Sequence, residues 1–405
     1  MKKVLWITLL AALALSACGP NGTIAQPTET PTAPTAPRVS ASPLPSSTPL
    51  LVLTPTPAST DTPTATSTPA YPPEGYGPSN FPTDVNPLTG LKVTDPTLLA
   101  RRPLAIKVSN LPRNVRPQWG LSLADIVYEY YTEEGSTRFI ALFLGNNADI
   151  VGPIRSARLF DGNIVRMYRA ILAFGSGDIR VRNRLYNSEY ASRLVSEYPA
   201  KCPPMCRYEP NGADYLITNT ADLTQYAQKQ AIDNGRQNLD GMYFNIIPPA
   251  GGQTVEHVFA RYSAAIYNRW DYEAANGKFA RNSETADDLT LGQNETYAPL
   301  TDRLNKEPIT ADNLAVIMVP HEYFTKVPEI VDMQFSGSGT AYVFRDGQAY
   351  KVNWSRPTAN SVLSLTGEDG KPFPFKPGNT WVEVMGIYSK AEQKGNDWRF
   401  TFSIP

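Results

Sequence analysis

The chain has 405 residues, of which 37 are proline, and its formal net charge is -1 because 37 Lys and Arg face 38 Asp and Glu. This balance excludes a general nucleic-acid binder, which needs a basic surface to meet phosphate. The prolines concentrate in residues 19–70, where 31 of 52 positions are Pro, Thr or Ser and none is aromatic. Such a segment has too little apolar surface to offset the entropy of ordering, so we expect a disordered tether over residues 19–75.

The first eighteen residues are organised like a secretory signal. Two lysines precede an apolar run, residues 4–15, that is too short to span a bilayer. The run ends in Leu-Ser-Ala-Cys, which resembles a bacterial lipobox and predicts lipidation of Cys18. An ordinary secretory signal with a chance cysteine is the alternative. Two acyl chains give stable anchoring, so we expect an extracytoplasmic protein attached to the bacterial cell membrane.

Two further cysteines, Cys202 and Cys206, lie close together in Cys-Pro-Pro-Met-Cys. In an oxidising compartment this spacing favours a local disulfide, and free thiols are the alternative. A metal site would need two further ligands, and the histidines, His257 and His321, lie far along the chain. We therefore expect neither a metal nor a cofactor.

The segment 84–250 mixes strand and helix patterns. Apolar or β-rich runs predict strands over 104–108, 126–131, 137–144, 170–174 and 214–218, with a hairpin joining the second and third. Apolar residues at helical spacing after residues 152–153 predict a first helix, and a second helix is predicted from Ala221 to about Asn234. Because strict strand–helix alternation is absent, we expect an α+β N-terminal domain.

The segment 253–405 changes character after the Pro-Pro-Ala-Gly-Gly run at 248–252. Strand patterns recur at 255–262, 264–270, 314–319, 342–344, 349–354 and 381–387. Asp346-Gly347 between two of these runs is a strong hairpin signal. We therefore expect a β-rich C-terminal domain.

Several phrases of this sequence resemble the YerB-like bacterial lipoproteins, a family described as a domain of unknown function with N- and C-terminal parts. They include Asn-Pro-Leu-Thr-Gly-Leu at 86–91, Ala-Asp-Ile-Val-Tyr-Glu at 124–129, Val-Gly-Pro-Ile-Arg-Ser-Ala-Arg at 151–158 and Phe-Lys-Pro-Gly-Asn-Thr-Trp at 375–381. The resemblance covers nearly all of 84–390 and implies an envelope lipoprotein with two domains, but no reaction. Family members often carry histidines near Ala173, Pro210 and Glu284, where this chain has none.

The densest group of polar residues lies in the first segment. Glu129 shares a strand face with Val127 and Tyr131, and a carboxylate among apolar neighbours needs a cation or a proton. Arginines 138, 155 and 158 are candidates for the cation. One interpretation is an ion-pair lattice that fixes the core.

A second interpretation is a binding cleft for an anionic or sugar-like ligand near the start of a helix. Its predicted residues are Arg138, Arg155, Arg158, Glu129, Ser109 and Asn110. A third is carboxylate catalysis on cell-wall glycan with Glu129 and Glu134 as the acid/base pair.

No serine-hydrolase frame of the Gly-x-Ser-x-Gly or Ser-x-x-Lys type occurs, and no phosphate-binding Gly-x-x-x-x-Gly-Lys run is present. We therefore expect a non-enzymatic lipoprotein that binds an envelope ligand, either a wall glycan or peptide or a protein partner. A cell-wall hydrolase is the alternative.

Overall fold

The computed structural model describes residues 71–209 and 215–404. Cys18 and residues 19–70 of the predicted tether lie outside the described residues. Within the described ranges, no helix is long and apolar enough to cross a membrane.

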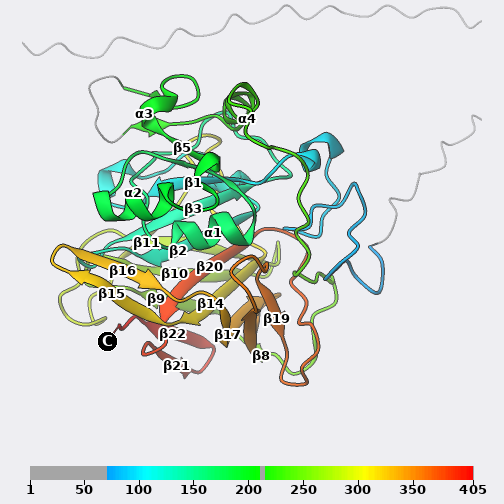
Figure 1. The fold of residues 1–405 in the computed structure, drawn as a ribbon. Helices are drawn as coiled ribbons and strands as arrows, with labels where there is room; N and C mark the ends of the chain where they lie inside the picture. Colours follow the sequence, from blue (N-terminus) through cyan, green and yellow to red (C-terminus); the bar gives the residue numbers. More distant parts are fainter. Residues whose placement is uncertain (1–70, 210–214, 405) are drawn as a thin grey trace, which may run out of the picture. The chain divides into compact units, whose positions relative to one another are not determined.

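One large mixed sheet forms the centre of the described chain (Figure 1). In spatial order it consists of β19 (Ser364–Thr366), β18 (Gln348–Arg356), β17 (Gly337–Arg345), β14 (Asn313–Val319), β20 (Thr380–Gly386), β2 (Ile126–Tyr131), β3 (Thr137–Phe143), β1 (Leu104–Ser109), β4 (Ile171–Phe174) and β5 (Leu194–Ser196), with β8 (Gln253–Thr254) beside β18.

A second sheet is built from the later part of the chain. In spatial order it consists of β12 (Tyr297–Pro299), β11 (Lys278–Glu284), β10 (Tyr267–Glu273), β9 (His257–Arg261), β22 (Asp397–Thr401) and β21 (Lys390–Lys394), with β13 (Thr310–Ala311) beside β11. Two further pairs are β15 (His321–Lys326) with β16 (Glu329–Met333), and β6 (Cys206–Arg207) with β7 (Leu216–Ile217).

The helices of the described ranges all precede the second sheet. They are α1 (Asp161–Met167), α2 (Ile179–Tyr186), α3 (Glu197–Ala200) and α4 (Thr220–Lys229), with short 3-10 turns η1 (Pro96–Ala100), η2 (Arg113–Val115), η3 (Leu121–Leu123) and η4 (Ala191–Arg193). This order confirms the predicted fold class, an α+β segment followed by a β-rich segment.

The central sheet takes strands from both segments. Strand β20 pairs in parallel with β14 on one side and with β2 on the other, and Figure 1 shows it in red beside the cyan β2. All seven residues of β20 and of β14 are buried. Strands that are buried along their whole length and are mostly apolar are typical of a sheet covered on both faces. The predicted boundary at residues 250–253 therefore separates two stretches of sequence but not two sheets.

Local turn and capping residues set several element ends. Asp346 and Gly347 have φ of 52° and 68°, the two left-handed positions that a tight hairpin turn requires, and this confirms the predicted hairpin between β17 and β18. Helix α4 begins after Asn219, whose side chain accepts from Ala221 N over 2.7 Å. It ends at Lys229, earlier than Asn234, because Ala231 has a left-handed φ of 52° that interrupts the helix.

Candidate functional site

Three neighbouring strands bring polar side chains to one edge of the central sheet. Ser109 at the end of β1 lies opposite Arg138 at the start of β3, and Arg138 lies opposite Tyr130 on β2. Residues directly opposite in a sheet project from the same face, so these three side chains emerge together. The chain after β3 returns to this edge, because Arg155 N donates to Lys107 O over 3.1 Å.

Arg138, Arg155 and Arg158 all lie at this edge, and together with Ser109 we call them the arginine edge. Arg155 Nε donates to Ser109 Oγ over 3.1 Å. The carboxylate of Glu133 lies 3.0 Å from Arg138 Nη2 and also pairs with Arg158. The side chains of Arg138 and Arg158 keep 16% and 17% of their surface exposed, so both are mostly buried and partly reached by solvent.

The charges of this edge act on one another. Burial alone would raise the pKa of Glu133, but Arg158 and Arg138 outweigh it and hold the pKa below its ordinary value. Burial, and then the charge of Arg158, lowers the pKa of Arg138 to about 10. Glu133 is therefore an ionised internal counter-ion for two arginines.

A buried lysine under the arginine edge was missed by the sequence reasoning. Lys107 is fully buried, lies 3.1 Å from Asp161, and donates to the hydroxyl of Tyr130. Burial lowers its pKa to about 7, and Arg138 and Arg158 add to this effect against the attraction of Asp161. The available signal was a single charged residue inside the apolar run Leu-Ala-Ile-Lys-Val.

Glu129 faces the opposite side of the central sheet from the arginine edge. It is fully buried, and it accepts from Thr137 over 2.8 Å and from Asn110 over 3.1 Å. Its charge partner is Arg281 of the second sheet, 2.7 Å away. The structure thus brings Asn110 to Glu129, but it does not bring Glu129 to the three arginines named from the sequence.

We call Glu129, Arg281 and Glu383 the buried charge cluster. Glu383 on β20 lies 3.2 Å from Arg281 and accepts from Trp270 and Tyr262, each over 3.0 Å. Burial, and then the charge of Glu129, raises the pKa of Glu383. The guanidinium of Arg281 is therefore the shared charge partner of two carboxyl groups that have no exposed surface.

The two carboxyl groups considered as a catalytic pair do not share a site. Glu129 has no exposed surface, whereas Glu134 is exposed in the turn between β2 and β3. The backbone N of Glu134 donates to Glu329 over 2.7 Å, and its φ is 47°. An acid/base pair must flank the same scissile bond, so this arrangement does not support the glycan-cleaving interpretation.

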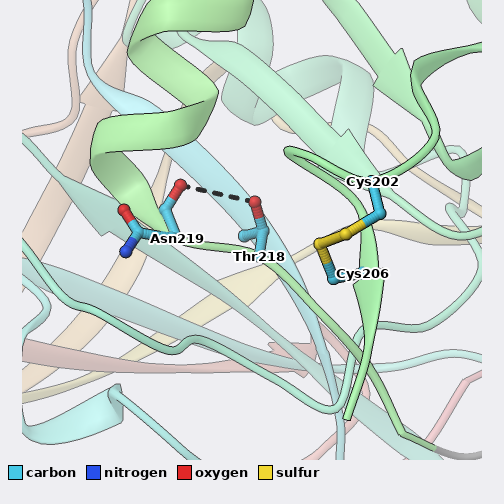
Figure 2. Close-up of a disulfide and its surroundings, with 4 residues drawn as sticks. All are labelled: Cys202, Cys206, Thr218 and Asn219. Atoms are coloured by element: carbon cyan, nitrogen blue, oxygen red, sulfur yellow. Dashed lines mark hydrogen bonds between the residues drawn. A yellow bond between two sulfur atoms is a disulfide. The ribbon is translucent and has the colours of Figure 1, made fainter.

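Cys202 and Cys206 form a disulfide with Cα atoms 4.5 Å apart (Figure 2). Figure 2 also shows Thr218, whose hydroxyl donates to Asn219 O over 3.5 Å at the start of α4. Cys206 pairs with Ile217 across β6 and β7.

A separate polar cleft of about 500 Å³ lies where Asn86, Asp125, Asp312 and Asn379 come together. Two pairs of these groups are bonded to each other, because Asn86 donates to Asp125 over 2.9 Å and Asp312 accepts from Asn379 N over 3.1 Å. Burial raises the pKa of Asp125 to about 6.

The described residues form an α+β segment followed by a β-rich segment, and one central sheet takes strands from both. Comparison with known families is specific: the DUF3048 N-terminal domain matches residues 88–233, and the DUF3048 C-terminal domain matches residues 258–382. The chain belongs to this family, which confirms the resemblance inferred from its motifs.

A relative from Bacillus subtilis, the YerB protein, agrees with this assignment both in sequence and in structure. The curated "Putative lipoprotein YerB" of strain 168 is 26% identical over 307 residues, which cover 74% of this chain and 85% of the relative. The crystal structure of the YerB protein from Bacillus subtilis has a TM-score of 0.62 at 24% identity, and the match covers 74% of this chain and 96% of that one. The structural likeness shows a shared fold.

Proposed function

We propose that this protein is an envelope lipoprotein, held to the membrane through Cys18, that binds an anionic fragment of the cell wall at the arginine edge. The observation that carries the proposal is the gathering of Arg138, Arg155 and Arg158 from two separate segments at one sheet edge. Guanidinium groups bind carboxylate and phosphate through paired hydrogen bonds. The name of the relative, a putative lipoprotein, supports the anchor.

The internal counter-ion gives the proposal a second support. Glu133 occupies Arg138 and Arg158 in the way that a carboxylate of a ligand would. An anionic ligand must therefore add to these arginines or displace Glu133. Removing the charge of Glu133 should strengthen binding, whereas removing an arginine should weaken it.

The binding test uses the full chain and soluble peptidoglycan fragments that carry free carboxylates, with affinity measured by calorimetry. Arg155→Ala should weaken binding about tenfold, the usual worth of one charged hydrogen bond. Glu133→Gln should strengthen binding severalfold at low salt. Lys390→Ala removes one positive charge from the exposed strand β21 and should leave the affinity unchanged.

Two results would overturn the proposal. One is an affinity that Arg155→Ala leaves unchanged while the variant remains folded by circular dichroism. The other is release of fragments from intact peptidoglycan by the full chain, with the release abolished by Glu129→Gln, because that result would make the protein a hydrolase.

The anchor is tested separately by Cys18→Ala. This variant should leave the membrane fraction for the soluble fraction, because no acyl chain can then be attached. Continued membrane association of the variant would contradict the lipidation of Cys18.

A further inference from the structure

A second cluster of arginines lies at the opposite end of the central sheet's strands, near the starts of β1, β4 and β5. Arg102 comes two residues before β1, Arg169 two residues before β4 and Arg193 one residue before β5. These three strands run parallel to one another, so their starts meet at one edge of the sheet. The arginine edge lies at their carboxyl ends, and this second cluster lies at their amino ends.

The three arginines line a cavity of about 420 Å³, which we call the amino-end pocket. Its wall also contains Ser192, Gln237 and Asn360 and two carboxylates, Glu189 and Asp233. The amide of Gln237 already donates to Gly235 O and Arg236 O, so the hydroxyl of Ser192 and the amide of Asn360 are the neutral groups that can donate to a ligand. The pocket therefore combines three guanidinium groups, two carboxylates and two neutral donors around one open space.

Within the described residues, neither carboxylate of the pocket wall forms an ion pair with Arg169 or Arg193. Asp233 pairs with Arg102, and Glu189 is taken by Arg166 at 2.7 Å. Arg193 reaches the carbonyl oxygens of Val165 and Ala170, at 3.3 and 3.4 Å.

Among the residues that the structure describes, the guanidinium of Arg169 has no hydrogen-bond or ion-pair partner. Like charges also face one another here. Burial, and then the charge of Arg102, lowers the pKa of Arg193 to about 10 against the attraction of Glu189, and Arg169 adds to the lowering. A bound anion would relieve this repulsion.

The backbone at Arg169 is unusual as well. Its φ of 53° lies in the left-handed region, which a residue with a long side chain rarely adopts. Held there, Arg169 donates its backbone N to Arg166 O over 3.3 Å, and its own carbonyl accepts from Arg102 over 2.9 Å. Two pocket arginines are thus fixed to each other through the backbone of one of them.

We infer that the amino-end pocket binds a phosphoryl group, as a phosphate monoester or diester. A planar carboxylate is satisfied by the fork of one guanidinium, whereas the oxygens of a phosphoryl group point in several directions and suit donors from three segments. Ser192 and Asn360 would bind the atoms to which the phosphoryl group is attached. The source is either the headgroup of an anionic lipid or a soluble phosphate ester of the envelope.

The experiment titrates the full chain carrying Cys18→Ala with glycerol phosphate, and separately with vesicles of phosphatidylglycerol or of phosphatidylcholine. The substitution removes any acyl chain that would itself hold the protein on vesicles. Arg169→Ala should weaken phosphoryl binding about tenfold, and Arg193→Ala serves as a second variant. Lys390→Ala, on exposed β21, should leave this binding unchanged, and Arg155→Ala is measured beside it to separate the pocket from the arginine edge.

The outcomes separate the two sources and the two sites. Binding of glycerol phosphate supports a soluble ester, and binding only to phosphatidylglycerol vesicles supports a lipid headgroup, provided that Arg169→Ala weakens either one. No binding of either probe overturns the inference. Loss through Arg155→Ala with no effect of Arg169→Ala also overturns it, because the phosphoryl group would then lie at the arginine edge.

Discussion

Replacing Arg281 with methionine removes the cation from the buried charge cluster. Arg281, Glu129 and Glu383 have no exposed side-chain surface. Methionine fills similar space without charge, so the carboxyl groups lose their counter-ion while the sheets remain in contact. A buried carboxylate without a partner takes up a proton rather than staying ionised.

The cost follows from that proton. The ordinary glutamate value is near 4.5, and each pH unit above it costs about 1.4 kcal/mol to keep the carboxyl protonated. At pH 7 the loss is about 3.5 kcal/mol for one carboxyl, which agrees with the roughly 3–5 kcal/mol for breaking a buried pair. At pH 5 the same reasoning gives less than about 1 kcal/mol.

The sign is that of a carboxyl that keeps its proton in the native variant and releases it on unfolding, so the stability of Arg281→Met relative to the parent falls as pH rises above about 4.5. The raised pKa of Glu383 is already present in the parent, so its cost is common to both proteins. Urea unfolding of both proteins at pH 5 and pH 7 measures this difference.

Two controls accompany the measurement. Arg182→Met on the exposed face of α2 should change the stability by less than about 0.5 kcal/mol. Adding Glu129→Gln to Arg281→Met should recover part of the loss, because one charge no longer needs a partner. A loss below about 1 kcal/mol at pH 7, or one that is equal at pH 5, would refute the reasoning.

Three further predictions concern the stability of the described chain. Burial and Glu129 raise the pKa of Glu383, so above pH 4.5 the native state holds a proton that the unfolded state releases. Glu383→Gln should therefore gain stability relative to the parent as pH rises, and equal urea midpoint shifts at pH 5 and pH 7.5 would contradict this. Burial lowers the pKa of His321 from 6.5 to about 4. As pH falls from 6.5 to 4, the parent should therefore lose up to about 3 kcal/mol of unfolding free energy that the His321→Phe variant retains. Parallel acid-unfolding curves of the two proteins would rule this out. The double variant Cys202→Ala with Cys206→Ala should lose no more than about 2 kcal/mol in thermal unfolding, since the disulfide spans only four residues, and a collapse of the whole fold would show that more depends on it.

Local patterns predicted much of the secondary structure. The hairpin of β2 and β3 follows from two β-rich runs with five turn residues between them, and the hairpin of β17 and β18 follows from Asp346-Gly347. Helix α2 was missed because only Val181 and Leu185 of its eight residues are buried. Two buried positions one turn apart give too weak a periodic signal among charged neighbours.

The partner of Glu129 could not be read from the sequence. The requirement for a cation was evident, since Glu129 lies among apolar residues of a buried strand. The nearby candidates were Arg138, Arg155 and Arg158, but these project from the other face or follow another strand. Arg281, the actual partner, lies 152 positions along the chain, and its approach depends on the contact between two sheets. Alternation along a strand predicts the face of a residue but not the element that covers that face.

Strand β2 connects these two environments. Tyr130 faces Lys107 and the arginine edge, whereas Glu129 faces the buried charge cluster. Strand β20 flanks β2, and Arg281 balances the charge of Glu129. Both come from beyond residue 250. A first segment standing alone would leave an unpaired edge at β2 and an uncompensated charge on Glu129, each of which is costly. The geometry of the arginine edge therefore depends on the second segment, although every arginine in it belongs to the first.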